Sequence, residues 1–180
     1  MNNLRNLVLS AMFVAVGIVL PFLTGQVPQI GNMLLPMHIP VFLCGLICGW
    51  QYGVTVGGIL PLLRSFLFGM PLLYPNAIAM AFELAAYGFV VGFLYHRVKR
   101  QNMLTIYGSM LVAMVAGRVV WGIAEVFLIG MGEGGFGWQM FVAGAFMNAI
   151  PGIILQLILI PSLLSVLHLT GLLRFKERER

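Results

Sequence analysis

MLTIYGSMLVAMVAGRVVWGIAEVFLI, residues 103–129, is the stretch of sequence that decides the fold class. A helix built from Leu104 to Gly117 would carry no charge on any face. About 20 such residues cross the roughly 30 Å of hydrocarbon in a bilayer, whereas membrane β-barrels give alternating segments of about ten residues. The stretch therefore predicts a transmembrane helix over 103–129.

The rest of the chain has the same composition. Hydrophobic residues make up 61% of the 180 residues and charged residues 8%, whereas a soluble domain carries about a quarter charged residues. Breaks in the apolar pattern predict helices over 4–23, 36–50, 52–69, 75–96, 103–129 and 139–169. We therefore expect one all-α integral membrane domain over residues 1–180, a bundle of six transmembrane helices.

Two boundaries of this bundle have alternatives. Only residues 49–53 separate the second helix from the third, and without a turn there the count becomes five. The first apolar run, Leu7 to Leu23, follows Arg5 as a signal peptide would. It is long, lacks an A-x-A cleavage pattern and contains Pro21 near its end, so we interpret it as a retained helix.

Basic residues set the orientation, because Lys and Arg near span ends stay cytoplasmic. With six spans, eight of them fall on one side: Arg5, Arg97, Lys99, Arg100, Arg174, Lys176, Arg178 and Arg180. The opposite loops, 24–35, 70–74 and 130–138, contain no Lys or Arg. Both termini are therefore predicted to be cytoplasmic, and the net charge of +5 is a topology signal rather than a nucleic-acid surface.

The predicted spans contain four charged residues, Arg64, Glu83, Arg118 and Glu125. A charge at the bilayer centre costs from about 2.5 to more than 10 kcal/mol, so each one needs a partner or water. One interpretation is two buried ion pairs that hold helices together, Arg64 with Glu83 and Arg118 with Glu125. The other is a binding pocket in the outer half of the membrane.

Neighbouring residues favour the pocket. Arg118, Trp121 and Glu125 lie at i, i+3 and i+7, which places them on one helix face. Further polar side chains are expected in the outer half: His38, Asn76 and Asn148. Tyr74 and a glycine-rich loop over 130–137 could close the site. Arginine binds carboxylates in a bidentate fork and tryptophan stacks on flat rings, so this lining suits a small, preferably aromatic, anion.

Catalysis has little support in the sequence. It has no G-x-S-x-G and no H-E-x-x-H motif, and His38, His96 and His168 are predicted at opposite ends of the bundle. It also lacks the G-x-x-x-x-G-K-[ST] motif of ATPases. We expect no enzyme, no metal and no cofactor, and any active transport would draw its energy from a partner.

Five segments carry a resemblance to a known family: Ala11-x-x-x-Ala15, LPMHIPV at 35–41, PLLRS at 61–65, GMP at 69–71 and MAFEL at 80–84. On these residues the chain resembles a substrate-binding S component of the prokaryotic energy-coupling factor (ECF) vitamin transporters. The resemblance implies a plasma-membrane subunit that captures a vitamin from outside and passes it to a transmembrane coupling subunit and two cytoplasmic ATPases. Ala11 and Ala15 would contact the coupling subunit. Niacin-type members are most similar, with pantothenate or pyridoxine members next.

We therefore expect an uptake subunit for a small vitamin such as nicotinate. Arg64 and Arg118 would bind the anion and Trp121 would stack on the ring, while the orienting residues would be His38, Asn76, Glu83, Glu125 and Asn148. Two alternatives remain open. A six-helix scaffold of the cell envelope, like a rod-shape-determining protein, would need no ligand. A stand-alone carrier would use Glu83 or Glu125 as an ion site.

Overall fold

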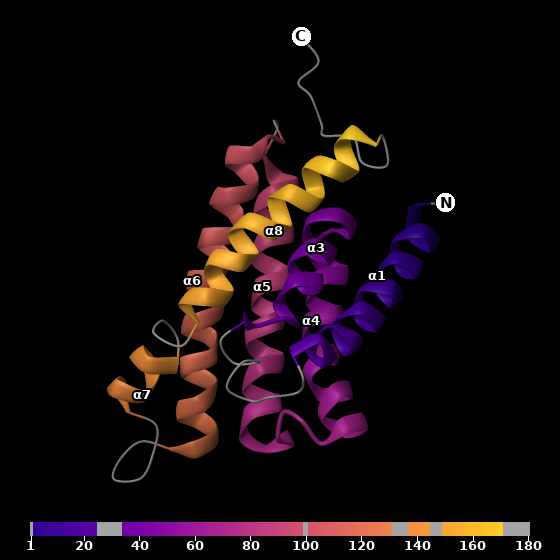
Figure 1. The fold of residues 1–180 in the computed structure, drawn as a ribbon. Helices are drawn as coiled ribbons and strands as arrows, with labels where there is room; N and C mark the ends of the chain where they lie inside the picture. The colour runs from indigo at the N-terminus through magenta and orange to yellow at the C-terminus, as the bar shows by residue number, and fades with distance from the viewer. Residues whose placement is uncertain (1, 25–33, 99–100, 131–136, 145–148, 171–180) are drawn as a thin grey trace.

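The computed structural model describes residues 2–24, 34–98, 101–130, 137–144 and 149–170 (Figure 1). In these ranges the chain is all helical and has no strand. The helices are α1 (Asn2–Val19), α3 (His38–Cys48), α4 (Trp50–Phe68), α5 (Ile78–Arg97), α6 (Met103–Ile129), α7 (Trp138–Val142) and α8 (Ile150–Leu169). A 3-10 turn, η1 (Leu20–Thr24), extends α1, and a π turn, η2 (Leu73–Ala77), leads into α5.

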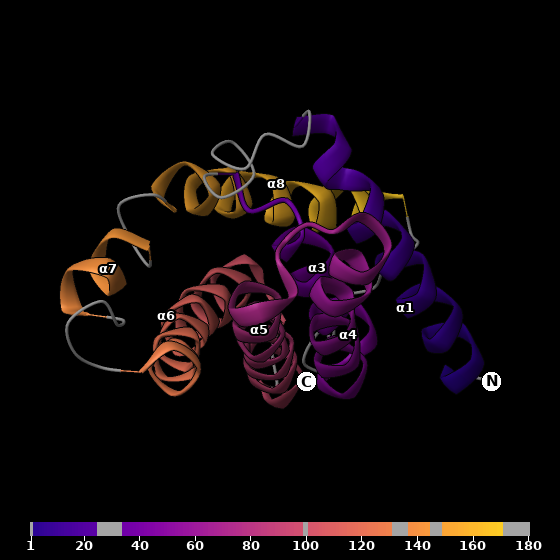
Figure 2. The ribbon, with the colours of Figure 1, turned by 90° about the horizontal axis from the view of Figure 1, so that it is seen from below.

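The long helices run side by side, and α3 lies at their centre. Figure 2 shows α3 between α8 on one side and α4 and α5 on the other, with α1 next to α4. Figure 1 shows that α1 begins, α5 ends and α8 ends at the same end of the bundle. At the opposite end, where α4 connects to α5, the helices α1, α3 and α8 do not extend as far as α4, α5 and α6.

Four helical stretches are long and apolar enough to cross a membrane: Asn3–Phe22, Leu73–Arg97, Met103–Ile129 and Ile150–Leu169. The prediction of an all-helical membrane protein is therefore confirmed. The predicted helix over 103–129 has these bounds in the structure. Those over 4–23, 52–69 and 75–96 differ by one or two residues when η1 is counted with α1 and η2 with α5. The six-span count stays a prediction, because α3 and α4 are not among the four stretches.

Helix α3 is shorter than the predicted 36–50. Its eleven residues cover about 16 Å at 1.5 Å per residue, which is half of the hydrocarbon thickness. Ten of the eleven are buried, so neighbouring helices surround α3 on every side. It ends at Gly49, whose φ of +100° breaks the helix and lets α4 begin at the next residue. The predicted helix boundary within 49–53 is thus confirmed at its first residue.

The single helix predicted over 139–169 is wrong, because α7 ends at Val142 and α8 begins at Ile150. Pro151 explains where α8 begins, since proline has no backbone N–H and suits the first helical turn.

Glycines fix α4 against α5. A Cβ at Gly53 would lie 2.7 Å from the carbonyl oxygen of Gly88, and one at Gly92 would lie 2.6 Å from the backbone of Trp50. No larger residue fits at these positions, so the two backbones are in direct contact. The contact fixes α5, which carries Glu83 and Tyr87 into the centre of the bundle.

Candidate functional site

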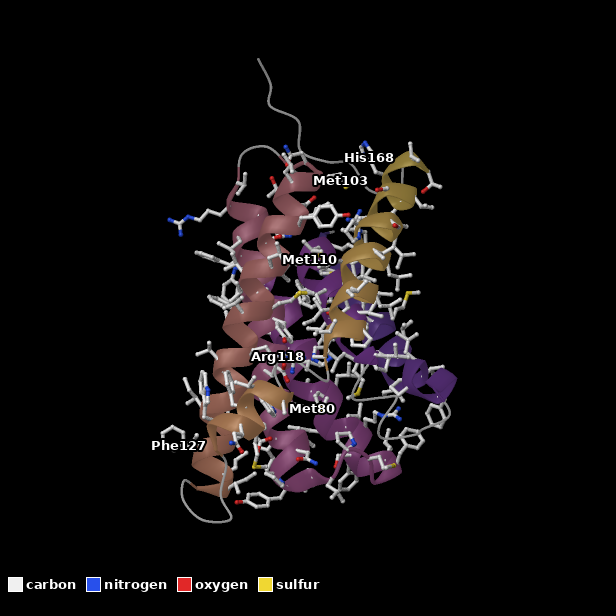
Figure 3. The ribbon with its side chains drawn as sticks, turned by 60° about the vertical axis from the view of Figure 1, so that its left-hand side comes forward. Met80, Met103, Met110, Arg118, Phe127 and His168 are labelled. Atoms are coloured by element: carbon white, nitrogen blue, oxygen red, sulfur yellow. The ribbon has the colours of Figure 1, made fainter. Side chains whose placement is uncertain are left out.

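A buried ion pair between α5 and α6 forms the centre of the site. The Glu83 side chain is 2% exposed, and its Oε1 atom lies 2.9 Å from Nη1 of Arg118. Tyr87, one helical turn after Glu83, donates a hydrogen bond of 2.9 Å to the same oxygen. Figure 3 shows Arg118 halfway along the bundle, between the levels of Met110 and Phe127 on the same helix. The two opposite charges are therefore paired deep in the protein, where a lone charge would be costly.

His38 brings α3 to this pair. It is the first residue of α3, and because that helix begins partway into the bundle, its buried ring lies at the level of Glu83. Its Nε2 atom is 3.8 Å from Oε1 of Glu83, which is too long for a hydrogen bond. Its ring centroid lies 5.2 Å from that of Tyr87. His38 therefore contacts the ion pair without bonding to it.

Within the part of the chain that the structure describes, three buried nitrogen atoms at this cluster have no hydrogen-bond partner: Nδ1 and Nε2 of His38 and Nη2 of Arg118. More than nine in ten buried polar groups in proteins are bonded, and an unbonded one costs about 1–3 kcal/mol. Arginine only donates hydrogen bonds, and a histidine ring carries at least one N–H. The cluster can therefore accept an additional negatively charged or acceptor-rich group.

Arg64 lies apart from this cluster. Its Nη1 atom donates a hydrogen bond of 2.6 Å to the carbonyl oxygen of Ile18 near the end of α1. Its guanidinium lies over two aromatic rings, 5.2 Å from the centroid of Phe22 and 5.7 Å from that of Phe68. The predicted pairing of Arg64 with Glu83 is wrong, because Glu83 pairs with Arg118 and Arg64 joins α1 to α4.

Trp121 and Glu125 form a second group one to two turns further along α6. Glu125, which follows Trp121 by four residues on the same helix, is 4% exposed. The pairing of Arg118 with Glu125 is also wrong, since the carboxylate that Arg118 contacts is that of Glu83. Arg118 lies eleven residues from the end of α6 and Glu125 lies four residues from it. Arg118 is therefore deeper in the bundle than Glu125.

Helix α7 covers Trp121. The ring of Phe141 stacks on Trp121 at 6.2 Å with 22° between the planes, and the ring of Trp138 stacks on Phe141 at 5.6 Å. Gly144 makes room for this packing, because a Cβ there would lie 2.7 Å from the Trp121 ring. Part of the predicted stacking surface of Trp121 is therefore occupied by α7.

The other predicted residues have different surroundings. Asn76 is exposed in η2, and Ala11 and Ala15 are exposed on α1. The predicted orienting residue Asn148 and residues 131–136 of the predicted lid lie outside the described residues. The hydroxyl of Tyr74, beside Asn76, donates a hydrogen bond to the carbonyl oxygen of Leu128 and so joins the start of α5 to the end of α6.

Two residues at the centre were missed by sequence reasoning, Tyr87 and Gly117. Tyr87 follows Glu83 by four residues, the spacing at which side chains on a helix meet, so its contact could have been predicted. Gly117 precedes Arg118, and its space is filled by the Tyr87 ring. That contact joins two helices and could be found only from the structure.

In a comparison with protein-family models, residues 5–164 match the family described as ECF transporter, substrate-specific component. Comparisons with curated proteins and with solved structures gave no match. The matched range holds the ion pair, His38, Tyr87 and α1 from Arg5 onward. Members of this family are substrate-binding membrane subunits that associate with the other subunits of a transporter, and they are not themselves enzymes. The chain belongs to the family of substrate-specific components of ECF transporters.

Proposed function

We propose that this subunit captures a small water-soluble vitamin from outside the cell, with the carboxylate nicotinate as the first candidate and pantothenate or pyridoxine next. The vitamin would be taken up by an ATP-driven complex with a transmembrane coupling subunit and two cytoplasmic ATPases. The observation that carries this proposal is the group of three unbonded nitrogen atoms of His38 and Arg118 beside Glu83.

The arrangement favours a carboxylate held from two sides. Nη1 of Arg118 is engaged by Glu83, so Nη2 is the nitrogen left to donate to a ligand. A ring N–H of His38 supplies a second donor from α3. A ligand carboxylate would therefore take one hydrogen bond from each helix instead of the bidentate fork that a free arginine offers.

The aromatic stack supports a ligand with a ring. Trp121 lies one turn from Arg118 on α6, and Phe141 and Trp138 extend the stack across α7. In the proposal these rings form the wall at the outer side of the anion site, and Asn76, Glu125 and Asn148 act at its outer margin. Arg64 is left out of the ligand contacts, because Ile18 and two phenylalanine rings already engage its guanidinium.

The proposed orientation places both termini in the cytoplasm and uses all six long helices as spans. Arg5, the turn at Gly49 and Arg97 belong to helix ends at one end of the bundle, where α1 begins and α5 ends. These arginines would face the anionic inner leaflet. In this arrangement the eleven residues of α3 cross about half of the bilayer.

Family membership favours this proposal over the two alternatives. An envelope scaffold would need no unbonded donors around a buried carboxylate. A carrier driven by an ion gradient would use Glu83 or Glu125 as an ion site, but Oε1 of Glu83 is already engaged by Arg118 and Tyr87. Both alternatives also lack the substrate-specific role that defines the family.

The test is direct binding. The full chain is purified in detergent and titrated calorimetrically with nicotinate, nicotinamide, pantothenate and pyridoxine. Nicotinate should bind more tightly than nicotinamide, which has the same ring without the charge. Equal affinity for nicotinate and nicotinamide would contradict the anion site. If none of the four compounds binds, the result would favour the scaffold.

A further inference from the structure

Tyr87 contacts every helix that contributes to the central cluster. It is 2% exposed on α5 and donates its hydroxyl proton to Oε1 of Glu83. Its ring centroid lies 5.2 Å from that of His38 and 5.1 Å from that of Phe42, both on α3. The third contact is with α6, at Gly117. A single side chain thus joins the three helices that carry Glu83, His38 and Arg118.

The contact with α6 depends on the absence of a side chain. A Cβ at Gly117 would lie 2.6 Å from Cδ1 of Tyr87 and 2.9 Å from Cζ, closer than real Cβ contacts. The ring therefore occupies the space that any other residue at 117 would fill. Since Arg118 is the next residue, this contact sets how far its guanidinium lies from α5.

Glu83 engages Arg118 through one nitrogen. Two partners, Arg118 Nη1 and the Tyr87 hydroxyl, converge on its Oε1 atom, each at 2.9 Å. Nη2 of Arg118 meets no hydrogen-bond partner among the described residues. An unrestrained carboxylate beside an arginine commonly rotates into a fork that engages two nitrogens. A fork here would take up Nη2, the donor assigned to the ligand.

We propose that Tyr87 is a positioning residue of the anion site. Its hydroxyl holds the Glu83 carboxylate in an orientation that leaves Nη2 of Arg118 for the ligand, and its ring, packed on Gly117, holds α5 and α6 at the required separation. This inference rests on the proposed function, because it assigns Nη2 to ligand binding.

Tyr87→Phe is the direct test, because it removes the hydroxyl and keeps the ring. We expect affinity for nicotinate to fall about tenfold, the effect of one lost charge-assisted hydrogen bond. The melting temperature of the ligand-free protein should stay the same or rise, because Glu83 and Arg118 pair more completely. A purely structural tyrosine would instead lose affinity and melting temperature together, and this outcome, or wild-type affinity, would overturn the proposal.

Gly117→Ala tests the ring contact, with Gly108→Ala as the matched control on the same helix. A Cβ at Gly108 meets nothing within 4 Å, whereas one at Gly117 displaces the Tyr87 ring. We expect Gly117→Ala to weaken nicotinate binding at least as much as Tyr87→Phe, and Gly108→Ala to bind as the wild type does. Equal affinity of both alanine variants would contradict the role of the ring.

A measurement without ligand separates this inference from the proposed function. Glu83→Gln, Arg118→Lys and the double variant are melted in the wild-type and in the Tyr87→Phe background. The non-additive part of the shift in melting temperature reports the coupling between Glu83 and Arg118. We expect a larger coupling without the hydroxyl. Equal coupling in both backgrounds would overturn the positioning role even if nicotinate binds, and a larger coupling would support it even if no vitamin in the panel binds.

Discussion

Nη1 of Arg118 on α6 lies 2.9 Å from Oε1 of Glu83 on α5, and no residue that the structure describes forms a hydrogen bond with Nη2 of the same arginine. The pair has no net charge, which lowers the free-energy cost of placing its two charged groups inside a membrane. The pair also leaves one hydrogen-bond donor, Nη2 of Arg118, unused among the described residues. This combination of balanced charge and an unused donor distinguishes the cluster from an ion pair that only holds two helices together.

Arg118→Lys should weaken nicotinate binding strongly while preserving the fold. Lysine keeps the positive charge beside Glu83 but has a single nitrogen and no planar fork, so it cannot serve Glu83 and a ligand in the same geometry. We expect a loss of about 1.5–3 kcal/mol, or roughly ten- to hundredfold, in calorimetric titrations.

Arg97→Lys is the matched control for that variant. Arg97 is exposed at the end of α5, where its guanidinium lies over Phe93, 5.1 Å from the ring centroid. The same chemical change there should leave affinity at the wild-type value. If Arg118→Lys also binds nicotinate as the wild type does, Arg118 is not a ligand contact.

Glu83→Ala should destabilise the protein and make it more dependent on ligand. The substitution leaves Arg118 buried without a carboxylate, and breaking a buried pair in this way costs about 3–5 kcal/mol. A bound nicotinate would supply a replacement carboxylate. The melting temperature should therefore fall in the ligand-free variant and rise more on addition of nicotinate than it does in the wild type. A smaller ligand-induced rise than in the wild type would argue that the ligand does not reach Arg118.

The helices of this fold could be predicted from the sequence because each is a long apolar run between polar or glycine-rich breaks. The prediction was most accurate for α6, where Asn102 caps the start through its side chain and Gly130 ends the helix with a φ of +87°. The prediction failed where the sequence stays hydrophobic across the boundary between two helices, α7 and α8. Residues 139–169 contain no Asp, Glu, Lys or Arg, and Pro151 marks the point near which α8 begins.

The charged residues of the candidate site could be predicted from the sequence, but which of them pair with each other could not. Buried charge singled out Arg64, Glu83, Arg118 and Glu125, all of which are 6% exposed or less. Their partners depend on depth and on which helices are adjacent. Arg64 on α4 donates to the carbonyl oxygen of Ile18 on α1, whereas Glu83 on α5 meets Arg118 on α6.

Arg64→Gln should lower stability and leave affinity unchanged. The amide can still donate to a carbonyl but loses the charge that interacts with the Phe22 and Phe68 rings. We expect a loss of about 1–3 kcal/mol in the free energy of unfolding, the range for a hydrogen bond from a charged donor together with cation–π contacts. Nicotinate affinity should stay within about twofold of the wild type, which is a change below about 0.4 kcal/mol in the free energy of binding. A tenfold loss of affinity with an unchanged melting temperature would return Arg64 to the ligand site.

Ala11→Trp and Ala15→Trp should abolish uptake in cells and leave nicotinate binding by the isolated subunit intact. Both alanines are exposed on α1, among larger side chains such as Met12 and Val16, which are 57% and 47% exposed. Small residues four apart let a second helix approach closely, and a tryptophan prevents that approach. The matched control is Leu111→Trp, which enlarges a side chain that is 50% exposed on α6. This control should transport normally, because bulk that only contacts lipid does not disturb a protein interface. Equal loss of uptake in all three variants would mean that tryptophan disturbs membrane insertion in general, whereas loss confined to the two alanine positions identifies α1 as the surface for the coupling subunit.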